Sequence, residues 1–187
     1  MRDLNDDPPT TTGTDGLFGR NKLLSKLAQS SIPHREFAHQ AEGKTVDASR
    51  IRRHSLSEAA KSLLIELSFS GKPNEFILAV VCGDELVDLL RVAAYMGARK
   101  ARLASKRYVS QVTGCPIGAV VPFSPRREIK VMADCRLFDQ KRLIFNSGVL
   151  NRSLEIKPQH YFELALPIIK RIGGHASEKQ HVKGGQK

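Results

Sequence analysis

The spacing of apolar positions predicts alternating helices and strands over the first part of the chain. One set of apolar residues at helical spacing predicts a helix that ends before Pro33: Leu23, Leu24, Leu27 and Ala28. Ser55-Leu56-Ser57-Glu58 matches a capping box and predicts a short helix from about Ser55 into Lys61. The apolar runs 63–69 and 76–81, separated by a turn at 71–74, predict two strands, the second buried on both faces.

Two more helices are predicted from residues that favour helix ends. Asp84 precedes a helical repeat that ends at Gly97, and Ser105 precedes another that ends at Gly114. Strand-like segments follow at 117–121, 128–132, 142–145 and 153–157.

The last predicted helix lies between two prolines. Pro158 precedes it, and it ends near Leu166 because Pro167 cannot continue it. Helices and strands are therefore interleaved early, and strands cluster late. This order predicts an α+β fold with a mixed sheet and argues against a doubly wound nucleotide-binding fold.

The chain has 187 residues, which suits one domain with tails. Residues 1–19, with two prolines and a threonine run, are predicted to be a disordered N-terminal tail. Residues 173–187 are predicted to be a disordered basic C-terminal tail. The folded domain is therefore expected to span 20–172.

Positive charge is concentrated in the predicted folded domain. The formal net charge is +11, of which residues 1–16 contribute −3 and residues 170–187 contribute +4, so about +10 belongs to the middle of the chain. The densest basic cluster contains no acidic residue: Arg99, Lys100, Arg102, Lys106 and Arg107. Such a cluster is either a solvated face or a surface for a polyanion. With no tryptophan and 6% aromatic residues, the chain offers no ladder for stacking bases.

Several classes of protein are disfavoured by what the sequence lacks. The longest apolar run, 76–82, is too short to span a bilayer, and the first residues do not resemble a signal peptide, so we expect a cytoplasmic protein without a membrane partner. Three cysteines without a CxxC pair predict neither a disulfide framework nor a zinc site. No Walker, GxGxxG or GxSxG motif appears, so no cofactor is expected.

The segment 113–123 contains two glycines around a Cys-Pro turn and an apolar stretch that ends in a second proline. Glycine permits positive φ and a close approach of ligand to backbone, so the amides near Gly118 could face a pocket. The same residues also suit an ordinary turn followed by a strand.

Taken together, several motifs resemble the YbaK / prolyl-tRNA synthetase editing-domain family. The most specific are Lys61, which follows a short helix and opens a strand, and the Gly-x-x-x-Pro motif formed by Gly118 and Pro122. Asn146-Ser147-Gly148 and Leu154-Glu155-Ile156 follow in the family's order, and the resemblance covers about residues 22–170. It implies one domain with a mixed, mainly antiparallel, partly barrel-like sheet surrounded by helices.

The resemblance implies a free-standing trans-editing deacylase that needs no metal or cofactor. The substrate would be a small misacylated amino acid, of the Ala, Cys or Ser type, esterified to tRNA and most often to tRNA(Pro). Its partners would be tRNA and a synthetase such as prolyl-tRNA synthetase, and the length of the chain, without a synthetase core, agrees with a separate protein. The alternative is a non-catalytic module of the same fold that binds tRNA or a synthetase.

By this resemblance, catalysis falls to Lys61 and to the backbone at Gly118, with a positioned water or the substrate's own hydroxyl completing the reaction. The basic cluster would bind the tRNA backbone. The substrate-binding residues would be Phe37, Ser62, Ala119, Pro122, Asn146, Ser147, Gly148 and Glu155.

Four features depart from the family pattern. Phe37 stands where a tyrosine is common, Ser62 replaces a threonine, and Glu155 replaces an aspartate. The loop between Ser147 and Glu155 is one residue longer. Each is either a neutral structural exchange or a change in amino-acid specificity, and they bear on the substrate more than on the reaction.

Overall fold

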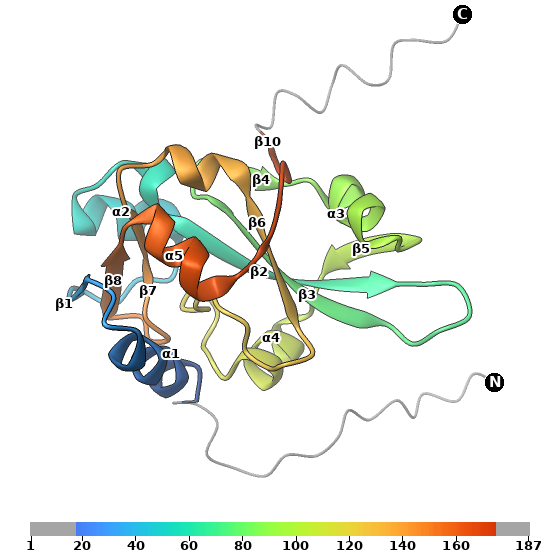
Figure 1. Ribbon diagram of the computed structural model, residues 1–187, viewed down its shortest axis with the longest axis horizontal. Coiled ribbons are helices and arrows are strands. Elements are labelled where there is room, and N and C mark those ends of the chain that lie inside the picture. The colour runs from blue at the N-terminus through green and yellow to red at the C-terminus, as the bar shows by residue number, and fades with distance from the viewer. Residues whose placement is uncertain (1–17, 175–187) are drawn as a thin grey trace, which may run out of the picture.

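A mixed five-stranded sheet forms the centre of the fold (Figure 1) in the computed structural model, which describes residues 18–174. In spatial order the strands are β5 (Lys100–Leu103), β2 (Ala60–Ser68), β3 (Glu75–Cys82), β6 (Lys130–Asp134) and β9 (Ile168–Lys170). The long strands β2 and β3 pair antiparallel, β5 pairs antiparallel with β2, and β6 and β9 continue in parallel from β3.

Two smaller sheets flank the centre. An antiparallel sheet has the order β1 (His34–Ala38), β8 (Arg152–Ile156) and β7 (Leu143–Asn146). A short pair joins β10 (Gly173–Gly174) to β4 (Leu86–Val87). The helices are α1 (Phe18–Ser30), α2 (Thr45–Arg52), α3 (Leu89–Met96), α4 (Lys106–Thr113) and α5 (Pro158–Ala165), with 3-10 turns η2 (Leu56–Glu58) and η3 (Cys135–Asp139).

Successive side chains along β2 and β3 point to opposite faces of the central sheet, so the hydrophobic core has one part on each face. Leu64, Leu78 and Val80 pack with side chains from α1, α5 and the three-stranded sheet. Ile65 and Ile77 pack on the opposite face, against side chains from α3. Because both faces are covered, β2 and β3 are buried and hold the residues at their ends in fixed positions.

Several sequence predictions are confirmed. The fold is α+β, with helices and strands in the expected order. Ser55 and Glu58 form the predicted capping box, Ser105 caps α4, and Gly114 ends it in a left-handed conformation. None of the three sheets is closed into a barrel within the described residues.

Three local predictions were wrong. The turn after Ser55 ends at Glu58, because Ala59 is extended, and Lys61 lies inside β2. Asp88, not Asp84, caps α3, since the residues between them form β4 and its contacts with β10. Residues 117–121 form an irregular loop instead of a strand, because the N–H of Ala119 donates to the carbonyl of Pro116 at 2.9 Å and closes a turn.

Other elements were shifted or missed. The strand expected at 128–132 lies at 130–134, and seven elements were not predicted: β1, α2, β4, β5, η3, β9 and β10. The predicted tails fall mostly outside the described residues, although β10 lies just past the boundary that was expected at 172. No described helix is long and apolar enough to span a membrane.

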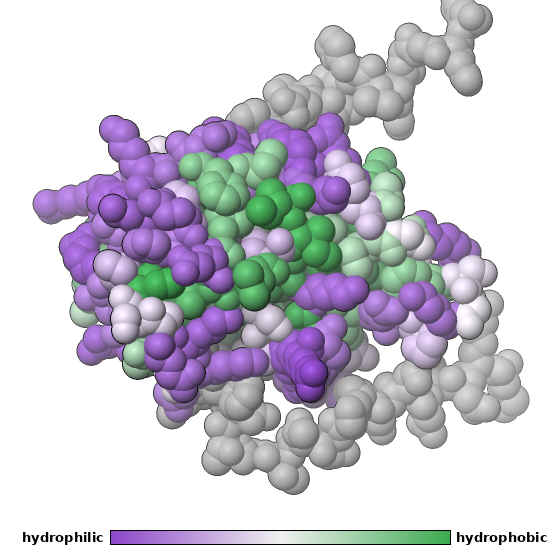
Figure 2. Space-filling view, viewed as in Figure 1, coloured by the Kyte–Doolittle hydropathy of each residue, from purple (hydrophilic) through white to green (hydrophobic). Residues whose placement is uncertain are grey.

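One face of the molecule carries apolar side chains within a hydrophilic surround, over α5 and the segment that leads to β9 (Figure 2). Phe138 of η3 is 46% exposed and stacks on Phe162 of α5 with ring centroids 3.7 Å apart. Leu166 and Ile169 are also exposed on these elements. This face is separate from the residues that the sequence singled out.

A buried carboxylate fastens the last described strand to the central sheet. Asp134, at the end of β6, accepts hydrogen bonds from the backbone N–H groups of Ile172 and Gly173, both at 2.6 Å, and from Arg171 at 2.9 Å. Burial alone would raise the pKa of Asp134, but these donors and the N–H of Arg136 hold it below its usual value.

We expect Asp134→Asn to lower the free energy of unfolding by about 2–4 kcal/mol at pH 7, because an amide cannot accept from all of these donors. The loss should be largest above the usual aspartate pKa of 3.8 and should shrink as the pH falls through the lower pKa of the folded state. Urea denaturation at several pH values measures both effects. The exposed Asp139→Asn is the control, and equal losses in the two variants would contradict the role given to Asp134.

Candidate functional site

A cavity of about 310 Å³ lies beside the start of β2, between α2, the 117–121 loop, β7 and the start of α4. Its polar end carries Thr45, Arg52, Lys61, Ser62, Gly118 and Asn146. Its apolar part is formed by side chains that include Leu63, Leu64, Leu103, Val109, Ile117 and Val120. The arrangement suits a ligand with one polar and one apolar part.

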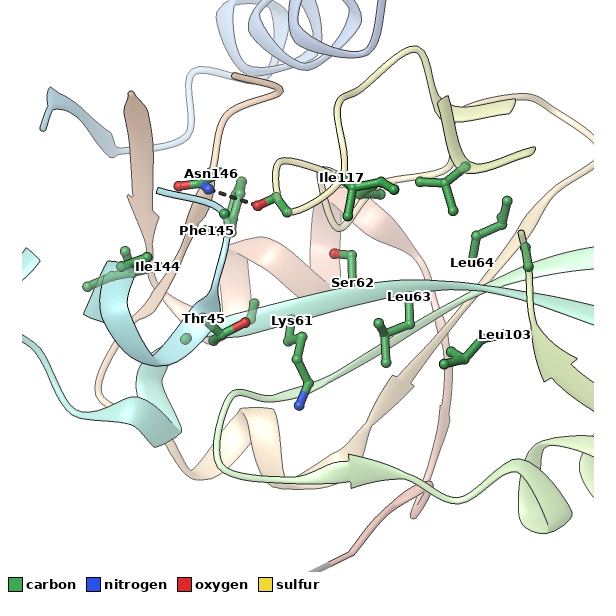
Figure 3. Close-up of a pocket in the computed structure, with 18 of the residues that line it drawn as sticks. Thr45, Lys61, Ser62, Leu63, Leu64, Leu103, Ile117, Ile144, Phe145 and Asn146 are labelled. Atoms are coloured by element: carbon green, nitrogen blue, oxygen red, sulfur yellow. Dashed lines mark hydrogen bonds between the residues drawn. The ribbon is translucent and has the colours of Figure 1, made fainter. Parts of the chain in front are cut away.

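The 117–121 loop is held by a very close approach of two backbones. Gly118 has φ of +86°, and a Cβ on it would lie 2.5 Å from the Cα of Gly43. Asn146 donates from Nδ2 to the carbonyl of Gly118 at 2.8 Å, as Figure 3 shows, and to the carbonyl of Glu42 at 3.0 Å. Since no side chain fits between the two segments, glycine is required at position 118.

The loop also leaves a backbone donor available. The N–H of Gly118 makes no hydrogen bond to any of residues 18–174, whereas the next N–H closes the turn onto Pro116. An unpaired amide beside a cavity can donate to a ligand oxygen.

Lys61 lies at the start of β2, with its ammonium group turned away from Ser62 and Asn146 (Figure 3). Nζ contacts the backbone carbonyl oxygens of Gly83, at 3.5 Å, and of Glu85. Burial lowers the pKa of Lys61, and the negative charges of Asp84 and Glu85 oppose that shift. In this conformation the cation is held by the turn between β3 and β4.

Ser62 points to the other side of β2, toward Ile117 (Figure 3). Its Oγ is buried and has no hydrogen-bond partner among the described residues. A buried hydroxyl without a partner is costly in a folded protein. Because Ser62 lines the cavity, a ligand group can satisfy it.

The remaining predicted substrate-binding residues do not line the cavity. The hydroxyl of Ser147 contacts Arg20 at 2.5 Å and Glu36 at 3.0 Å. Gly148, with φ of +86°, packs against α1, since a Cβ there would lie 2.8 Å from that of Arg20. These two residues join β7 to α1.

Glu155 and Phe37 belong to the three-stranded sheet. Glu155 forms ion pairs with Arg35 at 2.6 Å and with Arg142 at 3.4 Å, and the Arg35 guanidinium lies 4.8 Å from the Phe37 ring centroid. Ala119 and Pro122 are buried within the loop that follows Gly118. The structure thus brings four predicted residues together around the cavity: Lys61, Ser62, Gly118 and Asn146.

Arg52 lines the cavity but was not among the predicted site residues. It ends α2, a helix of mostly polar residues with no apolar repeat, so nothing in the local pattern distinguished it from a solvated arginine. The cavity also includes Gly43 and Thr45, which precede and begin that helix.

The basic cluster surrounds β5 and the start of α4. Arg99, Lys100, Lys106 and Arg107 are exposed, and Lys106 also lines the cavity. Arg102 is already neutralised by Glu66, with two contacts at 2.9 and 3.0 Å. Lys106 and Arg107 occupy the first turn of a helix, where the helix dipole disfavours positive charge. No group of three or more potential metal ligands occurs among residues 18–174.

Comparison with known proteins identifies the family of this fold. The family model of aminoacyl-tRNA editing domains matches residues 39–164. The Multifunctional Ser/Thr-tRNA deacylase ProXp-y of Escherichia coli strain K12 is 34% identical over 153 residues, which cover 81% of this chain and 91% of that protein.

Solved structures share the fold at lower identity. The hypothetical protein APE2540 has a TM-score of 0.74 at 21% identity, and the match covers 82% of this chain and 99% of that one. A structure described as a candidate trans-editing enzyme for prolyl tRNA synthetase has a TM-score of 0.71 at 16% identity, with coverage of 88% and 99%.

We expect Gly118→Ala to lower the free energy of unfolding by about 2–4 kcal/mol, because it combines a strained φ with a clash against backbone. Gly97→Ala is the matched control: its φ is also positive, at +63°, but no atom lies within 4 Å of a Cβ there, so it should cost only about 1 kcal/mol. Urea denaturation compares the two. Equal losses would show that strain alone, and not the approach of Gly43, constrains the loop.

Proposed function

The chain belongs to the aminoacyl-tRNA editing domain family, and from this premise we propose that it is a trans-editing deacylase. It hydrolyses the ester bond between a small misacylated amino acid and the 3′ end of a tRNA. The observation that carries this proposal is the cavity itself, which collects Lys61, Ser62, Gly118 and Asn146 at one end.

The side chains at the polar end favour an amino acid with a hydroxyl group. The unsatisfied hydroxyl of Ser62 can exchange a hydrogen bond with a serine or threonine side chain. The named E. coli relative is a Ser/Thr-tRNA deacylase, which supports the same choice. Among the small amino acids expected from the sequence, serine is therefore the leading substrate, with threonine beside it.

The chemistry requires no covalent intermediate. Lys61 contacts backbone carbonyls, and within the described part of the chain the Ser62 hydroxyl has no partner that could act as a base and no cysteine lines the cavity. A water, or the neighbouring hydroxyl of the terminal ribose, completes the reaction while the N–H of Gly118 donates to an oxygen of the ester. Lys61, which lines the same cavity, supplies the ammonium group that attracts the anionic 3′ end.

Such an activity is needed because a synthetase active site cannot fully distinguish similar amino acids. One methylene or hydroxyl changes binding by only about 1–3 kcal/mol in a pocket of fixed shape, so some wrong amino acids are attached. A second site that accepts only small residues removes them. The narrow cavity between the Gly118 loop and β2 fits that task.

We propose that the basic cluster binds the tRNA backbone. Its four exposed cations extend from the rim of the cavity along β5 and α4, and Lys106 contributes to both surfaces. Positive charge in the first turn of α4 costs helix stability, which favours a role in binding over one in folding.

Wild-type protein should release labelled amino acid from Ser- and Thr-charged tRNA faster than from Ala- or Cys-charged tRNA, with tRNA(Pro) included among the acceptors. Lys61→Met keeps the apolar stem and should slow release by about 100-fold or more, because it removes the ammonium group that attracts the anionic 3′ end and so keeps the ester in place. Exposed Lys72→Met is the control. If no substrate is hydrolysed, the deacylase proposal is wrong and the alternative of a non-catalytic binding module is favoured. If Lys61→Met releases amino acid at the normal rate, the role proposed for Lys61 is wrong.

The double variant Lys106→Glu/Arg107→Glu should weaken tRNA binding and reduce the slope of log K against log salt by about 2 units, one for each phosphate that the cluster no longer neutralises. Filter binding across a salt series measures this slope. The exposed lysines Lys141 and Lys157 lie outside the cluster, and reversing both provides a control of equal charge. If the two double variants have equal slopes of log K against log salt, the tRNA backbone does not bind at the basic cluster.

A further inference from the structure

Arg52 is a half-buried cation whose hydrogen-bond partners among the described residues are all neutral. Its Nε donates to the carbonyl of Ala48 at 2.9 Å. Its Nη1 donates to Oγ of Ser153 at 2.9 Å and to Oδ1 of Asn146 at 3.2 Å. These contacts fix the plane of the guanidinium without neutralising its charge.

No carboxylate within residues 18–174 forms an ion pair with Arg52, although the same fold supplies carboxylates to other arginines. Arg136 contacts Asp84, Arg142 contacts Glu58, and Arg171 contacts Glu85. Burial lowers the pKa of Arg52 to about 10, so it remains a cation at neutral pH. A partly desolvated charge without an opposite charge is costly, and such a cost is offset when an anion binds.

The guanidinium keeps donors for a ligand. Nη2 makes no hydrogen bond to the described residues, and Arg52 lines the polar end of the cavity. Asn146 connects it to the loop, because the carboxamide accepts from Arg52 and donates to the carbonyl of Gly118. Lys61, by contrast, directs its ammonium group to the turn between β3 and β4.

We propose that Arg52 is a catalytic residue that binds the carbonyl oxygen of the aminoacyl ester through its free Nη2 donors and stabilises the negative charge that forms there. The inference rests on the proposed deacylase function and adds to it the cation that acts on the reacting group. The same donors then hold the carboxylate of the released amino acid.

The reaction balances without any further reagent. The oxygen of a water attacks the carbonyl carbon, and the carbonyl electron pair moves to the oxygen beside Arg52. When that pair returns, the bond to the ribose oxygen breaks, and the ribose oxygen takes a proton that the attacking water has lost. The second proton of that water is released as the acid ionises, which leaves tRNA with a free hydroxyl and an amino acid carboxylate.

Single-turnover hydrolysis of Ser-tRNA, with enzyme in excess, tests the proposal. Arg52→Gln should lower the rate constant at saturation by about 100-fold or more while the enzyme concentration for half-maximal rate changes little. Arg50→Gln removes the same charge from the exposed face of the same helix, where Arg50 pairs with Asp47, and should leave both values unchanged. In Arg52→Ala, added guanidinium ion should restore part of the rate, and thermal unfolding of each variant reports on folding.

A saturating rate equal to that of wild type would overturn the proposal. An Arg52→Gln variant that only needs a higher enzyme concentration for half-maximal rate, with an unchanged saturating rate, would also overturn it. Such a result would indicate that Arg52 binds a tRNA phosphate and not the ester. The proposal would also be overturned if the variants that lose activity are unfolded and guanidinium ion does not restore the rate of Arg52→Ala.

A second readout separates this inference from the deacylase function itself. If wild-type protein releases no amino acid, the proposed function fails, yet the oxyanion site is still testable by titration with free L-serine and with serinol, which lacks the carboxylate. The Arg52 side-chain NMR signal, assigned by its absence in Arg52→Lys, should shift with L-serine only. If L-serine and serinol shift the Arg52 signal equally, or if neither shifts it, the proposal that Arg52 binds the carboxylate is wrong.

Discussion

Asn146 lies where four segments of the chain meet, and its carboxamide uses every hydrogen-bonding group that it has. Nδ2 donates to the carbonyls of Glu42 and Gly118, and Oδ1 accepts from Arg52 and Ser153. A buried amide that satisfies both donors and both acceptors has one orientation, because rotating it would oppose donors to donors. The segment before α2, the end of α2, the Gly118 loop and β8 are therefore placed relative to one another by this side chain, and the polar end of the cavity depends on it.

Two kinds of buried charge coexist in this small domain. Asp134 and Glu85 are fully covered, both form ion pairs with arginines, and Asp134 also accepts from backbone donors, so they stabilise the last strands of the fold. Arg52 is compensated only by neutral oxygens of the described residues and faces a cavity. In the first arrangement the opposite charges lie within the described chain, whereas in the second the opposite charge is supplied only when a negatively charged group enters the cavity.

The sequence was most informative where structure is decided locally. The capping box at Ser55, the cap at Ser105 and the glycine that ends α4 each act within a few residues, so their patterns could be recognised directly. Asp84 was mistaken for a cap because the residues after it pair with β10, almost ninety positions further on. The place of Arg52 in the site could not be predicted, since it depends on contacts with Asn146 and Ser153 and not on its neighbours in the chain. The expected roles of Lys61 and Gly118 came from family resemblance, because neither residue has a distinctive environment in sequence alone.

The contact between Gly43 and Gly118 also limits how such a site can diversify. Because the backbone of Gly43 leaves no room for a side chain at position 118, this part of the cavity wall is backbone whatever amino acid the cavity receives. Any redesign or natural drift in selectivity must therefore act through the side chains that line the cavity, among them Thr45, Ser62 and Leu63. The cavity thus combines a fixed stretch of backbone with side chains that can vary, and those side chains determine which substrates it accepts.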